Sequence, residues 1–374
     1  METDNTYYVV IDNFYDLFDY TNGLRAEPLR GIPDDEIGHL YDHDATLGGR
    51  KPEKNDDTSF RPGQYLNIKR TAEKSCFFGI ITSRDFPVIG EYYHRHYAEK
   101  AGLLPDTVFA GTSGGYRYKV NLASDAEPEV IPVRDENGNP YDAKLIRSAV
   151  VGMHIITDAL EKRVPSIVKS DRRVLGSTAL CSEFPDDEML QNFRQYAKDL
   201  TDKLQECLSH RIKLVIDSKF NEKRTGYSDL KILYATKYQA VIEILQLRKQ
   251  KGLKQPKFVF AAGDTSPDLM IIKAAKDFFG NEKVLGVGVG SVIQREDTDH
   301  LLNVVLKGNS PIVSDMQKGF FTDVDMMHVF LAYLRAPEKT RAYIKNIEDS
   351  LGANRSEKSI FAAKRASPAA AKYE

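Results

Sequence analysis

Acidic residues stand close together at two places in this chain, each just after a short apolar run. Asp42 and Asp44 are separated by one residue, and Asp264 and Asp268 by three. Aspartate is common in ordinary turns, so a solvated turn is one explanation of both patterns. Carboxylates at this spacing could instead act as a nucleophile, exchange a proton or bind Mg²⁺.

The apolar runs that precede these residues predict a mostly parallel α/β sheet, because helical patterns follow them. The expected strands are 36–41, 76–81, 257–262 and 283–289. In an open sheet of this kind, ligands gather where the strands end. We therefore expect the residues that follow the strands to share one edge of the sheet: Asp42, Thr82, Ser83, Arg84, Asp264 and Asp268.

Lys237 opens a helical pattern that has Thr236 as its expected N-cap and Gly252 as its stop. A lysine in the first turn of a helix is unfavourable, because the helix N-terminus already carries partial positive charge. A nearby anion would reverse the sign of that effect, and an exposed lysine on the surface is the alternative. The position therefore makes Lys237 a candidate for binding an anionic group.

Asp268 has two interpretations, which the sequence leaves open. It could stabilise the start of the helix that follows it, an effect worth about 0.3–1 kcal/mol. It could also join Asp264 in a site for Mg²⁺, which favours carboxylate ligands. Two acids so close together repel each other unless a cation neutralises them, and Lys237 or the metal would do so.

In order along the chain, these segments resemble the four motifs of the haloacid dehalogenase (HAD) superfamily of phosphatases. Asp-His-Asp-Ala-Thr at 42–46 matches the first motif, and the strand that ends in Thr-Ser-Arg at 77–84 matches the second. The lysine within 234–245 matches the third, and Gly-Asp-x-x-x-Asp within 258–268 matches the fourth. The Thr-Ser-Arg triplet is similar to that of the Cof, or sugar-phosphatase, branch, whose members carry a large C2B-type cap between the second and third motifs.

The resemblance implies a Rossmann-like parallel-sheet core with an inserted α+β cap domain. It assigns 37–88 and 226–353 to the core and 89–225 to the cap. Residues 1–36 then form an N-terminal extension. Residues 354–374 are poor in large apolar side chains and are expected to be a disordered tail.

The resemblance also implies a role for each motif residue in a Mg²⁺-dependent phosphatase. Asp42 would attack phosphorus and form an aspartyl phosphate, and Asp44 would protonate the leaving alcohol. Thr82 and Lys237 would hold the other phosphoryl oxygens. The implied metal ligands are Asp42, Asp44, Asp264 and Asp268, and the implied substrate-binding residues are Thr82, Ser83, Arg84 and Lys237.

Asp12 competes with Asp42 for the first motif, because a stronger strand pattern precedes it. Phe14, two positions further on, cannot exchange a proton. Asp12 lies 70 residues before Thr82, whereas Asp42 lies 40 residues before it, which leaves room for one loop and one helix. We favour Asp42, and residues 12–20 remain a candidate amphipathic helix that faces the core or a partner.

Several residues depart from the family pattern or imitate other motifs. Ala45 and Tyr238 stand where the family usually has glycine, and the tyrosine ring could crowd or gate the phosphate pocket. The pair Asp323 and Asp325 opens an apolar helical run, so helix capping explains it. The glycines of 286–291 lack the dinucleotide-binding spacing and predict a strand end followed by a tight turn.

Composition and charge exclude several classes of protein. With 374 residues, of which 41% are hydrophobic and 28% charged, the chain is globular and long enough for two domains. A formal net charge of −2 gives no reason to expect a nucleic acid or an anionic membrane as a partner. No apolar run is as long as a membrane helix, the N-terminus lacks the basic region of a secretory signal, and the three cysteines form no zinc pattern. We expect a cytoplasmic protein.

The favoured function is hydrolysis of a small phosphorylated metabolite, above all a sugar phosphate, and this substrate is the expected partner. A phosphotransferase or phosphomutase on the same scaffold is one alternative, since it would pass the phosphoryl group to a second alcohol instead of water. A binding or regulatory protein that kept the fold without turnover is another. The sequence does not indicate an oligomeric state.

Overall fold

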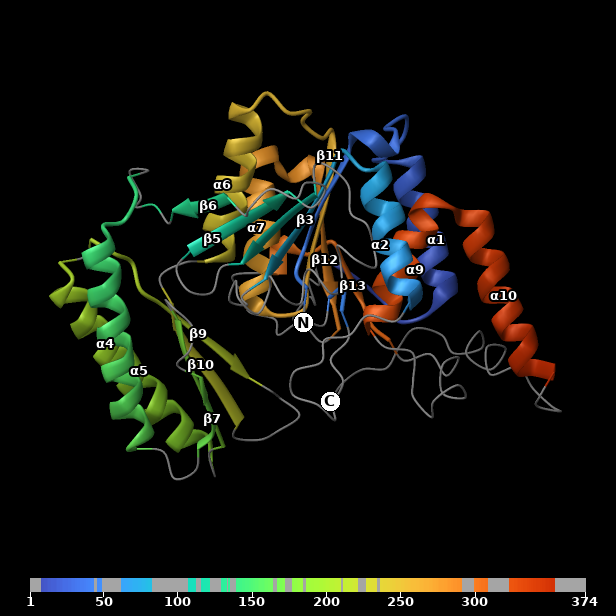
Figure 1. The fold of residues 1–374 in the computed structure, drawn as a ribbon. Helices are drawn as coiled ribbons and strands as arrows, with labels where there is room; N and C mark the ends of the chain where they lie inside the picture. The colour runs from blue at the N-terminus through green and yellow to red at the C-terminus, as the bar shows by residue number, and fades with distance from the viewer. Residues whose placement is uncertain are drawn as a thin grey trace, which may run out of the picture.

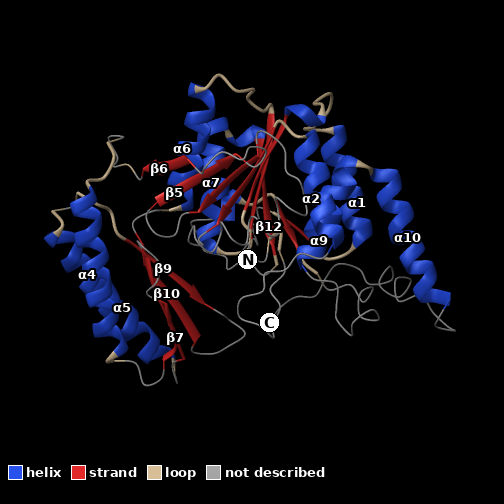
Figure 2. Cartoon of the chain, in the orientation of Figure 1, coloured by secondary structure: helices blue, strands red, loops and turns tan. Residues whose placement is uncertain are grey.

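The computed structural model contains two β-sheets and the helices that pack on them (Figures 1 and 2). It describes residues 8–43, 46–48, 62–82, 107–111, 116–121, 129–132, 134, 139–163, 167–171, 177–183, 186–209, 211–220, 227–233, 236–290, 299–308 and 323–353. Among these residues, the large sheet has nine strands and the small sheet has four.

The large sheet has the strand order β1-β13-β12-β11-β2-β3-β4-β5-β6. Neighbouring strands from β1 to β4 pair in parallel, and β5 and β6 continue the sheet in antiparallel pairs. The strands are β1 Val9–Ile11, β2 Ile37–Tyr41, β3 Phe77–Thr82, β4 Thr107–Gly111, β5 Tyr116–Asn121, β6 Glu129–Pro132, β11 Phe258–Gly263, β12 Val284–Val289 and β13 Val304–Leu306. The predicted α/β class is confirmed, and the four predicted strands agree with β2, β3, β11 and β12 to within one residue at each end.

Helices cover both faces of the parallel strands (Figure 1). Every residue of β2, β3, β11 and β12 is buried, as expected for parallel strands that are covered on both sides. One face carries α6 (Lys237–Gln250) and α7 (Ser266–Phe279), and the other carries α1 (Phe14–Ala26), α2 (Pro62–Lys74), α9 (Asp323–Arg335) and α10 (Pro337–Ala353). Short 3₁₀ turns are η1 (Asp34–Glu36), η4 (Asn281–Lys283) and η5 (Asp299–Leu301). No described helix combines the length and the apolar composition that crossing a bilayer requires.

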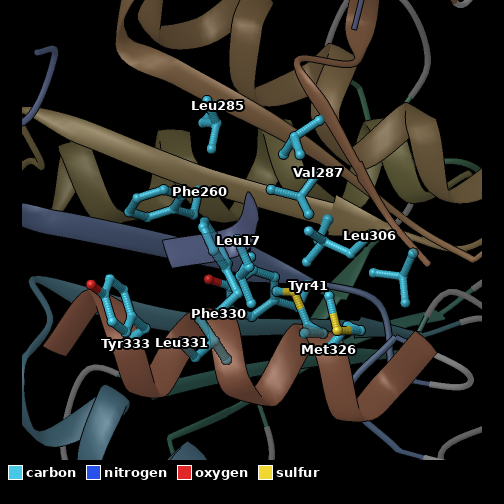
Figure 3. Packing of buried hydrophobic residues seen from close by; sticks show 14 of the residues in the cluster. Leu17, Tyr41, Phe260, Leu285, Val287, Leu306, Met326, Phe330, Leu331 and Tyr333 are labelled. Atoms are coloured by element: carbon cyan, nitrogen blue, oxygen red, sulfur yellow. The ribbon is translucent and has the colours of Figure 1, made fainter. Parts of the chain in front are cut away.

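The larger core cluster lies between the sheet and α9. Figure 3 shows Met326 and Phe330 of α9 on the side of the helix that faces Tyr41 of β2 and Phe260 of β11. The rings of Phe260 and Phe330 meet edge to face, with their centroids 5.7 Å apart. This packing fixes the positions of β2 and β11, the two strands that end at acidic residues.

The N-terminal segment belongs to the same core. β1 pairs in parallel with β13, and Phe14, Leu17 and Phe18 of α1 are buried. The prediction of an amphipathic helix near residues 12–20 is therefore confirmed, with its apolar face in the core. Residues 8–36 thus contribute a strand and a helix to the α/β layers.

The small sheet is antiparallel, with the strand order β7-β8-β10-β9. Its strands are β7 Ile167–Asp171, β8 Ser177–Glu183, β9 Val215–Phe220 and β10 Tyr227–Leu233. The helices α4 (Ala143–Glu161) and α5 (Asp187–Cys207) share a core cluster of their own with residues that lead into β9. The predicted cap consists of residues 89–225, yet β4 to β6, which lie within this range, extend the large sheet. β10 lies beyond residue 225 yet belongs to the small sheet. The domain boundaries stay a prediction.

Candidate functional site

Two neighbouring strands bring Asp42 and Asp264 to the same edge of the large sheet. β2 and β11 pair in parallel, with Tyr41 opposite Ala262. The backbone N–H of Asp42 continues this ladder, because it donates to the Ala262 carbonyl at 3.0 Å. β11 ends one residue later, at Gly263, so Asp264 follows at the same edge as Asp42.

Asp42, Asp264 and Asp268 form a cluster of carboxylates. One carboxylate oxygen from each lies within 4.8 Å of the others. Asp42 and Asp268 are only 3% and 2% exposed, whereas Asp264 is half-buried. Like charges at this separation repel strongly when they are removed from water, so the cluster requires a cation.

The Lys237 ammonium is a cation within reach of the cluster. Its Nζ donates to Oδ1 of Asp42 and, at 2.5 Å, to Oδ1 of Asp268, and its side chain is only 5% exposed. Burial alone would lower the pKa of this ammonium, but the Asp268 and Asp42 carboxylates more than offset burial and hold the pKa above its ordinary value. The alternative of an exposed surface lysine is therefore wrong.

The start of α6 gives Lys237 its position. The predicted N-cap is confirmed: the Thr236 hydroxyl accepts from the Gln239 backbone N–H at 3.3 Å, and the Gln239 side chain accepts from the Thr236 N–H at 3.2 Å. This reciprocal capping box fixes the first turn of the helix. The neighbouring carboxylates supply the anions that make a lysine acceptable in that turn.

The first interpretation of Asp268, that it stabilises the start of the following helix, is confirmed, whereas its part in a Mg²⁺ site with Asp264 stays a prediction. The Oδ2 of Asp268 accepts from the Thr265 backbone N–H at 3.0 Å and from the Thr265 hydroxyl, within the capping box that begins α7. Its Oδ1 accepts from Lys237. Both oxygens are engaged by the protein, which suits Asp268 to hold Lys237 in place.

Gly263 permits the close approach of α7 to the end of β11. A Cβ atom at this position would lie 2.3 Å from the Cβ of Asp268. A side chain here would therefore push Asp268 away from the cluster. Sequence reasoning missed this contact with Asp268.

The other predicted site residues lie at or beyond the ends of β2 and β3. Thr82 is the last residue of β3, the strand beside β2, and is 1% exposed. It therefore ends at the predicted edge of the sheet. Asp44, Ser83 and Arg84 lie outside the described residues, as does Ala45, and their roles stay predictions.

A buried polar network holds the chain just after Asp42. The His328 Nε2–H of α9 donates to the Leu47 carbonyl at 2.8 Å. The Asn67 amide of α2 donates to His328 Nδ1 at 3.2 Å and to the His328 carbonyl at 2.8 Å. These partners together assign the proton of a neutral imidazole to Nε2. Sequence reasoning missed this network, because its residues lie 261 and 281 positions apart and form no motif.

Asp12, the rival of Asp42, lies elsewhere on the sheet. It follows β1, which is separated from β2 by β13, β12 and β11. Its side chain is exposed, and one carboxylate oxygen accepts from the Asn13 amide at 3.2 Å. This position favours Asp42 for the first motif.

Asp323 and Asp325 make contacts between segments of the core. Asp323 Oδ1 accepts from the Gly308 backbone N–H at 2.5 Å. Asp325 is buried, and its Oδ1 accepts from the Gln64 amide of α2 at 3.2 Å. The predicted explanation by helix capping is therefore incomplete, since both residues join α9 to other elements.

Tyr238 packs on α7. Its hydroxyl donates to Asp277 at 2.9 Å, and the Lys273 Nζ lies 5.2 Å from its ring centroid. Partial burial and the Asp277 carboxylate both raise the pKa of the hydroxyl. These contacts orient the ring toward the C-terminal half of α7, where Lys273 and Asp277 lie. Neither contact involves a residue of the carboxylate cluster.

The chemistry of the cluster fits a Mg²⁺ ion. Carboxylate oxygens are the protein ligands that Mg²⁺ prefers, and it usually keeps several waters, which the half-buried position of Asp264 allows. Because both Asp268 oxygens are engaged by Lys237 and Thr265, Asp42 and Asp264 are the better suited ligands.

Comparison with known proteins gives similarity at the level of structure. No protein-family model matches the chain, and no curated protein matches it. The chain is similar to the C-terminal domain of C. albicans trehalose-6-phosphate phosphatase, with a TM-score of 0.53 and 12% identity over 88% of this chain and 99% of that one. It is also similar to Aspergillus fumigatus trehalose-6-phosphate phosphatase, with a TM-score of 0.50 and 14% identity over 87% of this chain and 98% of that one.

Similarity at 12% and 14% identity establishes the fold alone. Their fold extends over most of this chain. The expected parallel α/β sheet with flanking helices is therefore confirmed as the architecture of this chain. The haloacid dehalogenase family, the Cof branch and the C2B-type cap stay predictions.

Proposed function

We propose that the chain is a phosphatase that hydrolyses a small phosphorylated metabolite through an aspartyl phosphate on Asp42. The observation that carries this proposal is the buried Lys237, whose ammonium joins Asp42 to Asp268 beside Asp264. Burying a lysine and two carboxylates costs desolvation free energy that their attraction often does not repay, so a contribution to stability alone does not explain this arrangement. At the ends of parallel strands it suits a site where a dianionic phosphoryl group must approach a carboxylate.

The chemistry follows from these residues in two displacements. In the first, an Asp42 carboxylate oxygen attacks phosphorus, the bond to the substrate alcohol breaks, and Asp44 gives its proton to the leaving oxygen. In the second, water attacks the same phosphorus, its proton goes to Asp44, and the bond to Asp42 breaks. Inorganic phosphate leaves, and Asp42 and Asp44 return to their starting states.

The surrounding residues stabilise charge and orient the nucleophile. The Lys237 ammonium, held by Asp268, binds Asp42 and would also bind a phosphoryl oxygen as negative charge develops there. Thr82 would bind a second phosphoryl oxygen, and Ser83 and Arg84 are proposed to contact the rest of the substrate. Asp42, Asp264 and the Asp44 carbonyl would hold Mg²⁺, which when bound neutralises the repulsion between the nucleophile and the phosphoryl oxygens.

The proposed substrate class is a sugar phosphate. The predicted Cof-type motifs support it, and the fold shared with trehalose-6-phosphate phosphatases agrees with it. The proposed cap, built from elements such as α4, α5 and the small sheet, would close over a small substrate and keep macromolecules out.

The experiment compares the two rival aspartates. Purified protein is assayed with p-nitrophenyl phosphate and Mg²⁺, before and after addition of EDTA. We expect Asp42→Asn to lose activity by on the order of 10³-fold or more, because the nucleophile is gone. Asp12→Asn is the matched control: Asp12 is exposed and follows β1, which three strands separate from β2, so activity should be unchanged.

Full activity in Asp42→Asn, or a loss confined to Asp12→Asn, would overturn the assignment. If EDTA has no effect, the proposed role of Mg²⁺ is wrong. A screen of phosphorylated metabolites, run beside Asp42→Asn, then tests the preference for sugar phosphates. Adding a second alcohol distinguishes a hydrolase, which releases inorganic phosphate, from a phosphotransferase, which forms a new phosphate ester.

A further inference from the structure

A cavity of about 170 Å³ opens near the amino-terminal end of β2, between α1, α2 and α9. Its polar wall includes Arg25, Lys74 and Arg335, and its floor includes His39 of β2. Asp42 follows the opposite end of the same strand. At about 3.3 Å per residue, the three steps from His39 to Asp42 span about 10 Å, so the cavity is separate from the carboxylate cluster.

The cavity is rich in positive charge. Three cationic side chains, Arg25, Lys74 and Arg335, face one carboxylate on the wall, Asp34. None of the three cations forms an ion pair with a carboxylate of the described residues. A small anion in the cavity would therefore meet an excess of opposite charge.

Arg335 is the fixed member of this group. Its Nη1 donates to the Thr71 hydroxyl at 3.1 Å and to the Asn67 carbonyl at 3.3 Å, so α2 holds the guanidinium at the wall. Partial burial lowers the pKa of Arg335 and the nearby Arg70 lowers it further, while the Asp34 and Glu73 carboxylates raise it without offsetting the other two effects. The charged guanidinium is therefore only partly compensated, and an anion would add to the compensation.

His39 adds a directed donor at the floor. Its ring stacks on Phe260, with centroids 5.5 Å apart, and on Phe78, with centroids 5.9 Å apart. Its Nδ1 is hydrogen-bonded to the Tyr41 hydroxyl. A phenol is protonated at neutral pH, and the hydroxyl satisfies both groups by donating to Nδ1. The imidazole proton then lies on Nε2, which has no hydrogen-bond partner among the described residues.

Apart from Thr71 and Ser75, the rest of the lining is apolar, and the volume suits a small ring or a short carbon chain. Leu29, Ile32, Ile37, Phe260 and Leu331 contribute to the wall. An apolar protein cavity of roughly 150 Å³ accommodates benzene. The cavity therefore combines space for a small apolar body with cations and an N–H donor for an anionic group.

We propose that this cavity is a second ligand site, which binds a small organic anion: its phosphate, phosphonate or carboxylate group lies among Arg25, Lys74 and Arg335, and its apolar body lies against Phe260. This inference does not depend on the proposed phosphatase activity. It concerns a different part of the fold, with the opposite balance of charge.

The test uses phenylphosphonate, whose phosphorus–carbon bond resists hydrolysis by a phosphatase. Nitrogen-15 NMR of the histidine rings in the full chain reports both the tautomer and the binding, and His39→Gln identifies the signal of His39. We expect His39 to carry its proton on Nε2 and its signal to shift saturably as phenylphosphonate is added. A saturable response elsewhere with no shift of His39 would overturn the proposal.

Two double variants distinguish binding in the cavity from binding to exposed cations elsewhere on the surface. Arg25→Gln/Lys74→Gln removes two exposed cations from the wall and should weaken binding at least tenfold. Lys339→Gln/Lys345→Gln removes two exposed cations that do not line the cavity, and binding should not change. Equal affinity in the wild type and both double variants, or absence of saturable binding at millimolar phenylphosphonate, would contradict the proposal.

Discussion

The two ends of β2 lie in environments of opposite charge, and that charge is compensated differently at each end. At the carboxyl end, Asp42 meets two further carboxylates, and a lysine buried between them neutralises part of their charge. At the amino end, three cations surround a cavity with one carboxylate on its wall. Charge that is buried must be matched within the protein, whereas charge that faces a cavity can be matched by water or a ligand.

The alternation of side chains along β2 separates the two environments. Ile37 and Tyr41 pack in the core cluster beneath α1, α2 and α9, whereas Leu40 packs in the cluster beneath α6 and α7. His39 shares a face with Ile37 and Tyr41, because side chains two residues apart point to the same side. Only Asp42, which follows the end of the strand, reaches the carboxylate cluster. One strand thus links two sites that share no residue.

The largest effect that this comparison predicts comes from removing the buried cation. In Lys237→Met, Asp42 and Asp268 lose the ammonium that both of them bind. We expect unfolding free energy to fall by about 3–5 kcal/mol, because breaking a buried pair leaves uncompensated charge. Urea denaturation at pH 7 measures the change.

Lys198→Met is the matched control for this lysine. Lys198 also contacts a carboxylate, that of Asp202 at 2.6 Å, but both side chains are more than half exposed, at 61% and 57%. The unfolding transition of this variant should coincide with that of the wild type. A similar loss in both variants would contradict the view that burial makes the Lys237 contacts important.

The second largest effect tests how closely the carboxylates must be held. Gly263→Ala adds a Cβ that would lie 2.3 Å from the Cβ of Asp268, so α7 must move away from β11. We expect a loss of about 3 kcal/mol, at the upper end of the cost of overpacking. Gly23→Ala in α1 is the control, because nothing lies within 4 Å of its Cβ; it should stabilise the protein by about 0.5–1 kcal/mol. Urea denaturation of both variants shows whether their shifts have opposite signs.

The third effect concerns the amino end of β2 and depends on pH. Burial lowers the pKa of His39 to about 3, so the folded protein keeps the ring neutral where the unfolded chain takes up a proton. Stability should therefore fall as the pH drops below about 6.5, by about 1.4 kcal/mol per pH unit, or about 2 kcal/mol between pH 7 and pH 5. The difference between wild type and His39→Gln, measured by urea denaturation at both values, isolates this contribution. Parallel pH profiles for the two proteins would show that His39 contributes nothing to the loss.

Local patterns predicted the strands and their acidic ends. Apolar runs followed by aspartate located Asp42 and Asp264, and the helix-start signal located Lys237. These predictions succeeded because strand and helix boundaries depend on neighbouring residues. The same reasoning predicted that Asp268 stabilises the start of its helix, which its contacts with Thr265 confirm, whereas its role beside Asp264 in a metal site stays a prediction.

Contacts between distant segments could not be predicted in this way. Asn67, His328 and Leu47 come from three separate segments, and no local sequence pattern predicts the hydrogen bonds between them. The pairing of β1 with β13 joins residues 295 positions apart, as Val9 and Val304 show. The cavity beside His39 arises from α1, α2 and α9 together, so its positive charge is invisible in any single stretch of sequence.

The smallest predicted effect concerns Tyr238, the residue after Lys237, which stands where the haloacid dehalogenase pattern usually has glycine. Tyr238→Phe removes the hydrogen bond to Asp277 but keeps the ring near Lys273. Because this bond is largely exposed to solvent, we expect less than about 1 kcal/mol of lost stability and no change in phosphatase turnover. Urea denaturation and the aryl phosphate assay measure the two quantities. A large fall in turnover with unchanged stability would instead assign the hydroxyl to the phosphate pocket. The charged site at the end of β2 would then include Tyr238 in the first turn of α6.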